Sequence, residues 1–292
     1  MKKKNLLLIL LVMVCFGLNA QNKQFTKFTV ASWNIGHFAL GKAGDTTLKH
    51  NVLDFYKQTY KAYFNELNAD ILALIEYNPV MVNATDKLPA VKARDAILSN
   101  YHEAQEGPQY DYNCNAIFSN GFEVLGTDTI MFSKMVQTRY YLVSTMRMDG
   151  DIVKVVSTHL DWNQGENGAP YRAIQIEEII EAFKNDKYVI LCADWNVSKT
   201  SEYSAFVNAG YKMANHGYLG DLLTYPAGSS PRSYLDNIIT KGFAIGNVKV
   251  GHQGQQADDD GIDDDKGHGH AQGHTIAIRK GSGTGLQERD QT

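Results

Sequence analysis

Apolar and polar positions follow two different periods between residues 28 and 250. "FTVASWNIG" (28–36) and "YVILCADWN" (188–196) are apolar runs typical of strands, whereas residues 48–67 repeat apolar positions with helical spacing. One face of that predicted helix collects Leu48, Val52, Phe55, Tyr56, Tyr60, Tyr63, Phe64 and Leu67. Strands that alternate with amphipathic helices predict a single α/β domain in which helices flank two sheets.

Turn signals divide the remaining apolar runs. "RYYLVSTMRM" and "DIVKVVSTHL" flank Asp149-Gly150, a pair that predicts a β-hairpin. Pro170 predicts the start of a helix that reaches about Phe183, because proline is tolerated in a first helical turn. "DILALIEYN" (70–78), "YLDNIITKG" and "IGNVKVG" predict further strands.

The N-terminus differs from the rest of the chain. "MKKKNLLLILLVMVCFGLNA" places three lysines before an apolar run and a small residue, Ala20, which predicts a signal peptide over residues 1–20. The alternative is an uncleaved anchor, but the apolar run is shorter than the ~20 residues that a spanning helix needs. We therefore expect a protein that is secreted or held in the bacterial periplasm or envelope.

Charge and cysteine content narrow the options further. The net charge of −4 does not favour tight, sequence-independent binding to duplex nucleic acid, although a local basic groove stays open. Its candidate cations, Lys212, Arg232 and Lys241, are dispersed. Cys114 and Cys192 lie in apolar runs, where we expect buried free thiols rather than a disulfide.

The composition changes after Gly251. Six aspartates and then several histidines follow, so we predict a flexible Asp/His-rich insertion over residues 258–273 within a domain of residues 21–280. A disordered tail is expected over residues 281–292. His268 and His270 are expected to be solvated, and the alternative is that this segment sequesters metal.

Polar residues recur where the apolar runs end. They are Asn34, Glu76, His159, Asp194, Asn196 and Asp236. Each residue alone has an ordinary structural interpretation, such as a capped turn or a satisfied histidine. Strand ends at one edge of a sheet nevertheless share a cleft, so these side chains together predict a site.

The order of five motifs carries more information than any one residue. "SWNIG", "DILALIEYN", "STHLDW", "LCADWN" and "SYLDNI" follow one another over residues 28–250. This order resembles the endonuclease/exonuclease/phosphatase superfamily, whose members include deoxyribonuclease I, bacterial sphingomyelinases and inositol polyphosphate 5-phosphatases. The resemblance implies a four-layer α/β sandwich, with two mixed β-sheets packed face to face and flanked by helices.

The resemblance also implies roles for the polar residues. Asn34 and Glu76 match metal-site residues, with Glu76 as the direct ligand, and oxygen donors suit Mg²⁺ or Mn²⁺. Asp194 matches an aspartate that positions or deprotonates the attacking water, and Asn196 matches an asparagine that contacts the phosphate. His159 matches a histidine that hydrogen-bonds the scissile phosphate.

Three further residues match positions of the family pattern. Asp236 matches an aspartate that supports the site by fixing a histidine. His274 takes the place of the last catalytic histidine before the strand "TIAI" (275–278), but Gln272 and Gly273 replace the usual Ser-Asp. Tyr112 matches a phosphate-contacting tyrosine, and an ordinary aromatic at a strand start explains it equally well.

These matches predict a secreted, metal-dependent phosphoesterase, with a nuclease among the options. The substrate stays open between nucleic acid, a phospholipid and a phosphosugar, so sphingomyelinase and phosphoinositide phosphatase activities are alternatives. We expect a monomer without a stable protein partner. Trp162 and Trp195 are expected to line the cleft. A catalytically impaired binding module is the competing class.

Overall fold

The structure is a computed structural model, and it describes eight separate ranges of the chain. They are residues 27–36, 50–81, 91–110, 114–162, 168–197, 199–214, 235–252 and 272–280. Tyr112, Arg232, His268 and His270 lie outside these ranges. For the last range the backbone alone is described. Within the described ranges, no helix is both long enough and apolar enough to cross a membrane.

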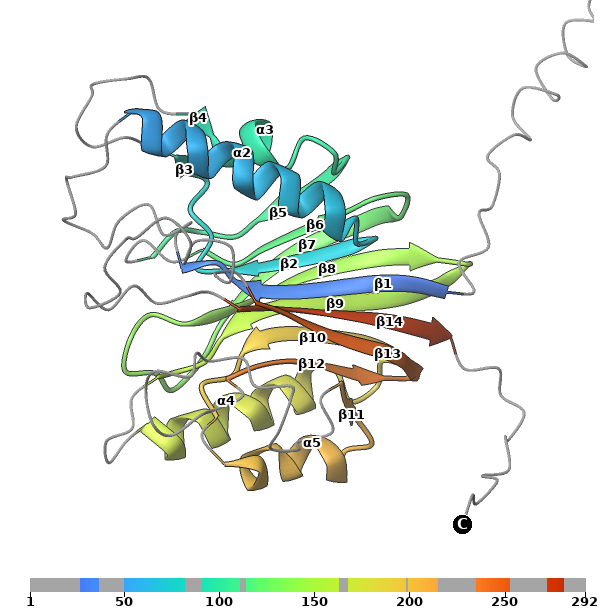
Figure 1. Ribbon diagram of the computed structural model, residues 1–292. Coiled ribbons are helices and arrows are strands. Elements are labelled where there is room, and N and C mark those ends of the chain that lie inside the picture. Colours follow the sequence, from blue (N-terminus) through green and yellow to red (C-terminus); the bar gives the residue numbers. More distant parts are fainter. Residues whose placement is uncertain are drawn as a thin grey trace, which may run out of the picture.

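Two six-stranded sheets form the centre of the molecule (Figure 1). The first contains, in spatial order, β13 (Phe243–His252), β14 (Gln272–Lys280), β1 (Lys27–Asn34), β2 (Ile71–Ile75), β6 (Ala116–Ser119) and β5 (Glu103–Glu106). The second contains β11 (Lys212–Met213), β12 (Asp236–Lys241), β10 (Tyr188–Asp194), β9 (Asp151–His159), β8 (Tyr140–Met148) and β7 (Glu123–Met131). A small hairpin pairs β3 (Val80–Met81) with β4 (Val91–Lys92).

Each large sheet is mixed in the same way. In the first sheet β1 pairs parallel with β2, and in the second β9 pairs parallel with β10. The other pairings in both sheets are antiparallel. Each sheet therefore has one parallel pair near its middle, and both strands of that pair end at the same edge.

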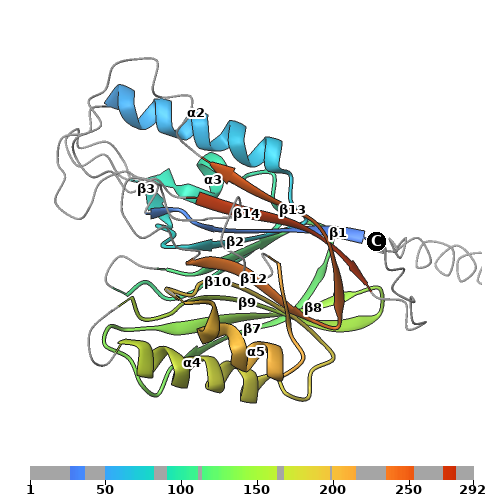
Figure 2. The same cartoon turned by 60° about the horizontal axis from the view of Figure 1, so that its bottom comes forward.

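Helices cover the outer faces of the sheets (Figures 1 and 2). On the first sheet lie α2 (His50–Leu67) and α3 (Ala93–Ile97). On the second lie α4 (Gly168–Ala182), the 3-10 turn Thr200–Tyr203 and α5 (Ser204–Asn208). The order helix, sheet, sheet, helix confirms the predicted four-layer sandwich.

Alternation along β1 shows how the sequence specifies these layers. Val30 faces the core between the sheets, whereas Trp33 faces the α2 side and packs its ring 4.7 Å from that of Tyr63. Successive strand residues point to opposite faces, so one strand supplies two cores. Truncating a fully buried aromatic such as Trp33 to alanine costs about 3–5 kcal/mol.

The predicted hairpin between β8 and β9 is confirmed. Met148 pairs with Asp151, which leaves Asp149 and Gly150 as a two-residue loop with φ of 50° and 82°. Positive φ at both loop positions is the type I′ geometry, whose twist matches that of the flanking strands. The Asp-Gly pair therefore fixes the register of two central strands.

Several boundaries and one burial assignment differ from the predictions. Helix α4 begins at Gly168, two residues before Pro170, which still lies in the first turn. The strand expected over residues 275–278 runs from Gln272 to Lys280, because β1 and β13 pair with it on both sides. Trp195 was expected to line a cleft and is instead fully buried under α5, since it points to the helical face of its sheet.

Candidate active site

The first sheet contributes Asn34 and Glu76 to one cluster of polar side chains. Asn34 is the last residue of β1, and Glu76 directly follows the parallel strand β2. The Asn34 Nδ2 donates a hydrogen bond of 3.1 Å to Oε1 of Glu76, while its Oδ1 accepts one from the Gly36 amide. Glu76 has a φ of 52°, and left-handed backbone at a non-glycine residue is found preferentially at functional sites.

The second sheet contributes His159, Asp194 and Asn196 in an equivalent way. His159 ends β9 and pairs in register with Asp194 at the end of β10, and its Nε2 lies 3.6 Å from Oδ2 of Asp194. The Asn196 amide donates to Oδ1 of Asp194, and the Asn196 side chain donates to the Leu160 carbonyl. Asn196 also has a positive φ, of 50°.

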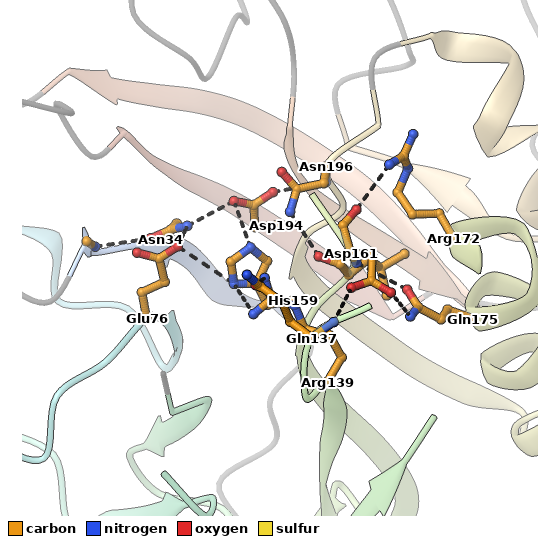
Figure 3. A network of polar contacts seen from close by, with 12 residues as sticks. Asn34, Glu76, Gln137, Arg139, His159, Asp161, Arg172, Gln175, Asp194 and Asn196 are labelled. Carbon is orange, nitrogen blue, oxygen red and sulfur yellow. Dashed lines mark hydrogen bonds and ion pairs between the residues drawn. The ribbon is translucent and has the colours of Figure 1, made fainter. Parts of the chain in front are cut away.

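The two halves meet across the sandwich (Figure 3). The Nδ2 of Asn34 donates a 2.9 Å hydrogen bond to Oδ2 of Asp194, and Nδ1 of His159 lies 3.7 Å from Oε1 of Glu76. Both parallel strand pairs therefore deliver their carboxyl ends to one place. Of the eight predicted site residues, the structure brings together Asn34, Glu76, His159, Asp194 and Asn196.

Burial and charge act together on Asp194. Loss of hydration raises the pKa of this carboxyl above its ordinary value, and the hydrogen bond from Asn34 opposes that shift. The neighbouring Glu76 carboxylate raises the pKa further, whereas the Asn196 amide and Arg139 lower it. The site therefore holds two acidic groups, Glu76 and Asp194, whose negative charges a nearby cation would stabilise.

Asp236 and His274 approach the same region through their backbones. Asp236 begins β12, pairs in register with Asp194 and is buried. His274 of β14 pairs with Ser32 of β1, two residues before Asn34, and its side chain is not described. The structure therefore places both residues on strands next to the site, and their roles stay predictions.

Arg139 is a member of the site that the sequence analysis missed. It precedes β8, is 4% exposed, and places Nη1 3.4 Å from Nδ1 of His159. Gln137 accepts a 3.2 Å hydrogen bond from its Nη2. An arginine just before an apolar strand is ordinarily exposed to solvent, so the sequence gives no sign that Arg139 belongs to the site. Only its contact with His159, which ends another strand, identifies it.

The dispersed lysines do not form a groove at the site. The Nζ of Lys241 donates to the carbonyl oxygens of Phe183 and Lys184 beyond the end of α4. Lys241 ends β12 while Asp236 begins it, so this lysine lies at the far end of the strand. Lys212 pairs with Thr240 next to the same end. Lys212 and Lys241 therefore lie away from the site, as their dispersal in the sequence suggested.

The donor set fits a hard divalent cation with few protein ligands. Glu76 supplies a carboxylate that is 24% exposed, and the Asp194 carboxylate lies on the other side of the Asn34 amide nitrogen. In the described ranges no group of three or more His, Cys, Asp or Glu side chains could enclose a metal. Mg²⁺ suits such an open site, because it keeps several waters and takes one or two carboxylates.

Two stacked mixed sheets, with a polar site at the ends of their parallel strands, define a class of α/β sandwich proteins. A model of the endonuclease/exonuclease/phosphatase family matches residues 31–259, and the chain belongs to this family. At the level of the family, the fold is that of phosphodiester hydrolases and nucleases. No curated protein sequence matches the chain.

Solved structures share the fold at low sequence identity. An endonuclease/exonuclease/phosphatase from Bacteroides vulgatus has a TM-score of 0.65 at 16% identity, and the match covers 88% of this chain and 100% of that one. A humanized D. rerio TDP2 has a TM-score of 0.63 at 15% identity, covering 87% and 99%. D. rerio TDP2 complexed with single strand DNA product has a TM-score of 0.62 at 14% identity, covering 87% and 99%.

Proposed function

We propose that the chain is an exported, metal-dependent phosphodiesterase in which Asp194 positions the attacking water. The observation that carries this proposal is the meeting of Asn34 and Glu76 from one sheet with His159 and Asp194 from the other. Hydrolysis of a phosphodiester needs an oriented water and donors for the charge on the phosphoryl oxygens. These four side chains supply both kinds of group.

Each residue then has a distinct task. The Asp194 carboxylate accepts a proton from the attacking water, and Asn34 holds that carboxylate in place through its 2.9 Å hydrogen bond. His159 donates from Nε2 to a phosphoryl oxygen, since Nε2 faces the Asp194 side of the site. We also propose Asn196 as a phosphate contact, because one of its two amide hydrogens is used by Leu160.

Glu76 is the residue that would hold a divalent cation directly, with Asn34 beside it. When bound, such a cation polarises the phosphoryl group and neutralises charge on the leaving oxygen. The like charges of Glu76 and Asp194 favour its binding, and in the absence of a cation the Glu76 carboxylate raises the pKa of Asp194. Oxygen donors favour Mg²⁺, or Mn²⁺, over softer metals.

Charge balance favours a diester over a monoester. Glu76 and Asp194 are opposed by Arg139 and, when present, by one divalent cation. These four charges sum to one positive charge, and an ionised Asp236 beside Asp194 brings the sum to zero. Either value complements the single negative charge of a phosphodiester better than the dianion of a monoester. Single-stranded DNA is the first substrate to test, because a structural neighbour was solved with a single strand DNA product.

A substrate panel tests the proposed function. Residues 21–292 would be assayed with Mg²⁺, with Mn²⁺ and with EDTA on single-stranded DNA, bis(p-nitrophenyl) phosphate, sphingomyelin and a phosphoinositide. We expect metal-dependent hydrolysis of at least one diester and slower release of phosphate from monoesters. A wild-type protein that binds these compounds without turnover would contradict the proposal and favour the binding-module alternative.

We also propose export after cleavage near Ala20, supported by the lysines and the apolar run that precede it. The full chain would be expressed in a bacterial host and the product recovered from the envelope and the medium. N-terminal sequencing should find Gln21 as the first residue. A cytoplasmic product that keeps Met1 would contradict export.

A further inference from the structure

Apart from its charge, Arg139 has no task in the chemistry proposed above, although it lies against the catalytic histidine candidate. Its guanidinium is buried, with Nη1 3.4 Å from Nδ1 of His159 and Nη2 bonded to Gln137 (Figure 3). Arginine is seldom buried unless its charge is engaged. Its position therefore calls for an explanation in terms of His159.

The chemistry of the two groups fixes the proton on the imidazole. A guanidinium only donates hydrogen bonds, so the nitrogen that faces Arg139 must accept with its lone pair. A neutral imidazole carries one ring proton, which then lies on Nε2. The Oε1 of Glu76 lies 3.7 Å from the same Nδ1, beyond hydrogen-bonding distance, so Arg139 is the nearer of the two groups.

We infer that Arg139 is a positioning residue that holds His159 in the neutral tautomer with its proton on Nε2. That nitrogen lies 3.6 Å from Oδ2 of Asp194 and faces the carboxylate that orients the attacking water. The inference rests on the proposed function, in which His159 donates from Nε2 to a phosphoryl oxygen. Arg139 acts through His159 and ensures that the donor is directed at the substrate.

A second group of buried polar residues fixes the segment that carries Arg139. The carboxylate of Asp161 accepts hydrogen bonds from the amides of Val136 and Gln137, at 3.0 and 3.3 Å. Gln175 of α4 donates a 2.8 Å bond to the same carboxylate and another to the Lys134 carbonyl. Asp161 is fully buried, so its carboxylate needs these donors in place of water.

The connection is therefore continuous from α4 to the imidazole. Gln175 and Asp161 bind the backbone of residues 134–137, Gln137 accepts a hydrogen bond from the guanidinium, and the guanidinium faces His159. Asp161 lies two residues after His159, so one strand end supplies both the histidine and the anchor of its partner. Such support is what keeps a catalytic group in one geometry.

The test combines nitrogen spectroscopy with kinetics on residues 21–292. Wild type, R139M, R139K and the matched control R147M would be labelled with [¹⁵N]histidine, and H159Q would identify the signals of His159. Arg147 lies on β8, the strand that Arg139 precedes, is 47% exposed and pairs with Glu123, so its removal takes away an equal charge far from the imidazole. Turnover of bis(p-nitrophenyl) phosphate with Mg²⁺ would be measured on the same samples.

We expect His159 to carry its ring proton on Nε2, with Nδ1 unprotonated, in wild type and in R147M. R139M should protonate Nδ1 and lower kcat about 100-fold with a small change in KM, because the donor then points away from the substrate. R139K should keep the wild-type tautomer at least in part, since an ammonium also only donates. Thermal unfolding would establish that the variants are folded, and if R139M unfolds the wild-type spectrum still decides, because the inference requires the ring proton on Nε2 there.

A wild-type proton on Nδ1 would overturn the inference, as would R139M and R139K spectra that both match wild type. Equal effects of R139M and R147M on kcat would also overturn it. If wild type lacks metal-dependent turnover on every substrate, the proposed function fails instead. The tautomer of His159 would still be read from the spectra in that case, so the two failures are distinguishable.

Discussion

The Nδ2 of Asn34 donates a 2.9 Å hydrogen bond to Oδ2 of Asp194, which lies 160 residues later in the chain. This bond joins the last residue of β1 in one sheet to the last residue of β10 in the other. The same nitrogen donates a 3.1 Å bond to Glu76. One neutral amide therefore stands between two carboxylates, and the two sheets are connected at the site itself.

Replacing Asn34 should show how strongly the Glu76 and Asp194 carboxylates repel a third negative charge at this position. N34A should lower the free energy of unfolding by about 1 kcal/mol through lost hydrogen bonding. N34D should be less stable than N34A in EDTA, because a third carboxylate then faces Glu76 and Asp194. Adding Mg²⁺ should reduce the difference in unfolding free energy between N34A and N34D. Urea unfolding in EDTA and in Mg²⁺ would measure it, and an N34D at least as stable as N34A in EDTA would contradict the expectation.

The Asp161 carboxylate should be needed for both stability and turnover. An asparagine at position 161 cannot accept from Val136, Gln137 and Gln175 together, so D161N should cost about 1–3 kcal/mol and release the segment that carries Arg139. D128N, at an exposed position of β7, is the matched control. Urea unfolding and kcat would be measured for both, and equal behaviour of the two variants would argue against this role.

Two glycines with the same φ of 82° should differ sharply in their tolerance of alanine. G150A should cost about 1–2 kcal/mol for left-handed backbone, since nothing lies within 4 Å of its new Cβ. G242A carries that strain and also brings its Cβ to 2.2 Å from the Lys187 carbonyl oxygen. It should cost about 1–3 kcal/mol more. Thermal unfolding of G150A and G242A measures the difference in stability between them. Equal losses of stability would contradict the close packing at the β12–β13 turn.

Both cysteines of the domain should be unreactive in the folded protein. They are free thiols, as expected from their apolar surroundings, and burial raises the pKa of Cys114 to about 12 and that of Cys192 still further. A raised pKa leaves little thiolate at about pH 8, and thiolate is the reactive form. Residues 21–292 should react slowly with a disulfide reagent until denaturant is added. T127C, on exposed β7, should react at once, whereas fast reaction of native wild type would contradict this burial.

Much of the fold follows from local patterns in the sequence. The Asp149-Gly150 pair predicts its hairpin, since only a few residue types adopt positive φ readily. Glu76 and Asp194 can be identified as site candidates because an ionised group that ends a fully apolar strand needs a compensating environment. The pairing of the two sheets depends on contacts between distant residues, and the family resemblance rather than periodicity predicts it.

The errors have equally physical causes. Trp195 follows Asp194 in the sequence, but adjacent strand residues point to opposite faces, so the tryptophan enters the helical core while the aspartate enters the site. Arg139 escapes detection because an arginine before a strand is ordinarily solvated. Its burial results from Asp161 and α4, which residue spacing does not reveal.

The central claim is that Glu76 and Asp194 of one site hydrolyse a phosphodiester with a divalent cation. The most direct measurement is kcat/KM of residues 21–292 on bis(p-nitrophenyl) phosphate, in Mg²⁺ and in EDTA, for wild type, E76A, D194A and the surface control H102A. We predict turnover by wild type and H102A that EDTA abolishes, and a loss of at least about 100-fold in folded E76A and D194A. Wild-type rates in both site variants, or wild-type turnover that persists in EDTA, would contradict the account.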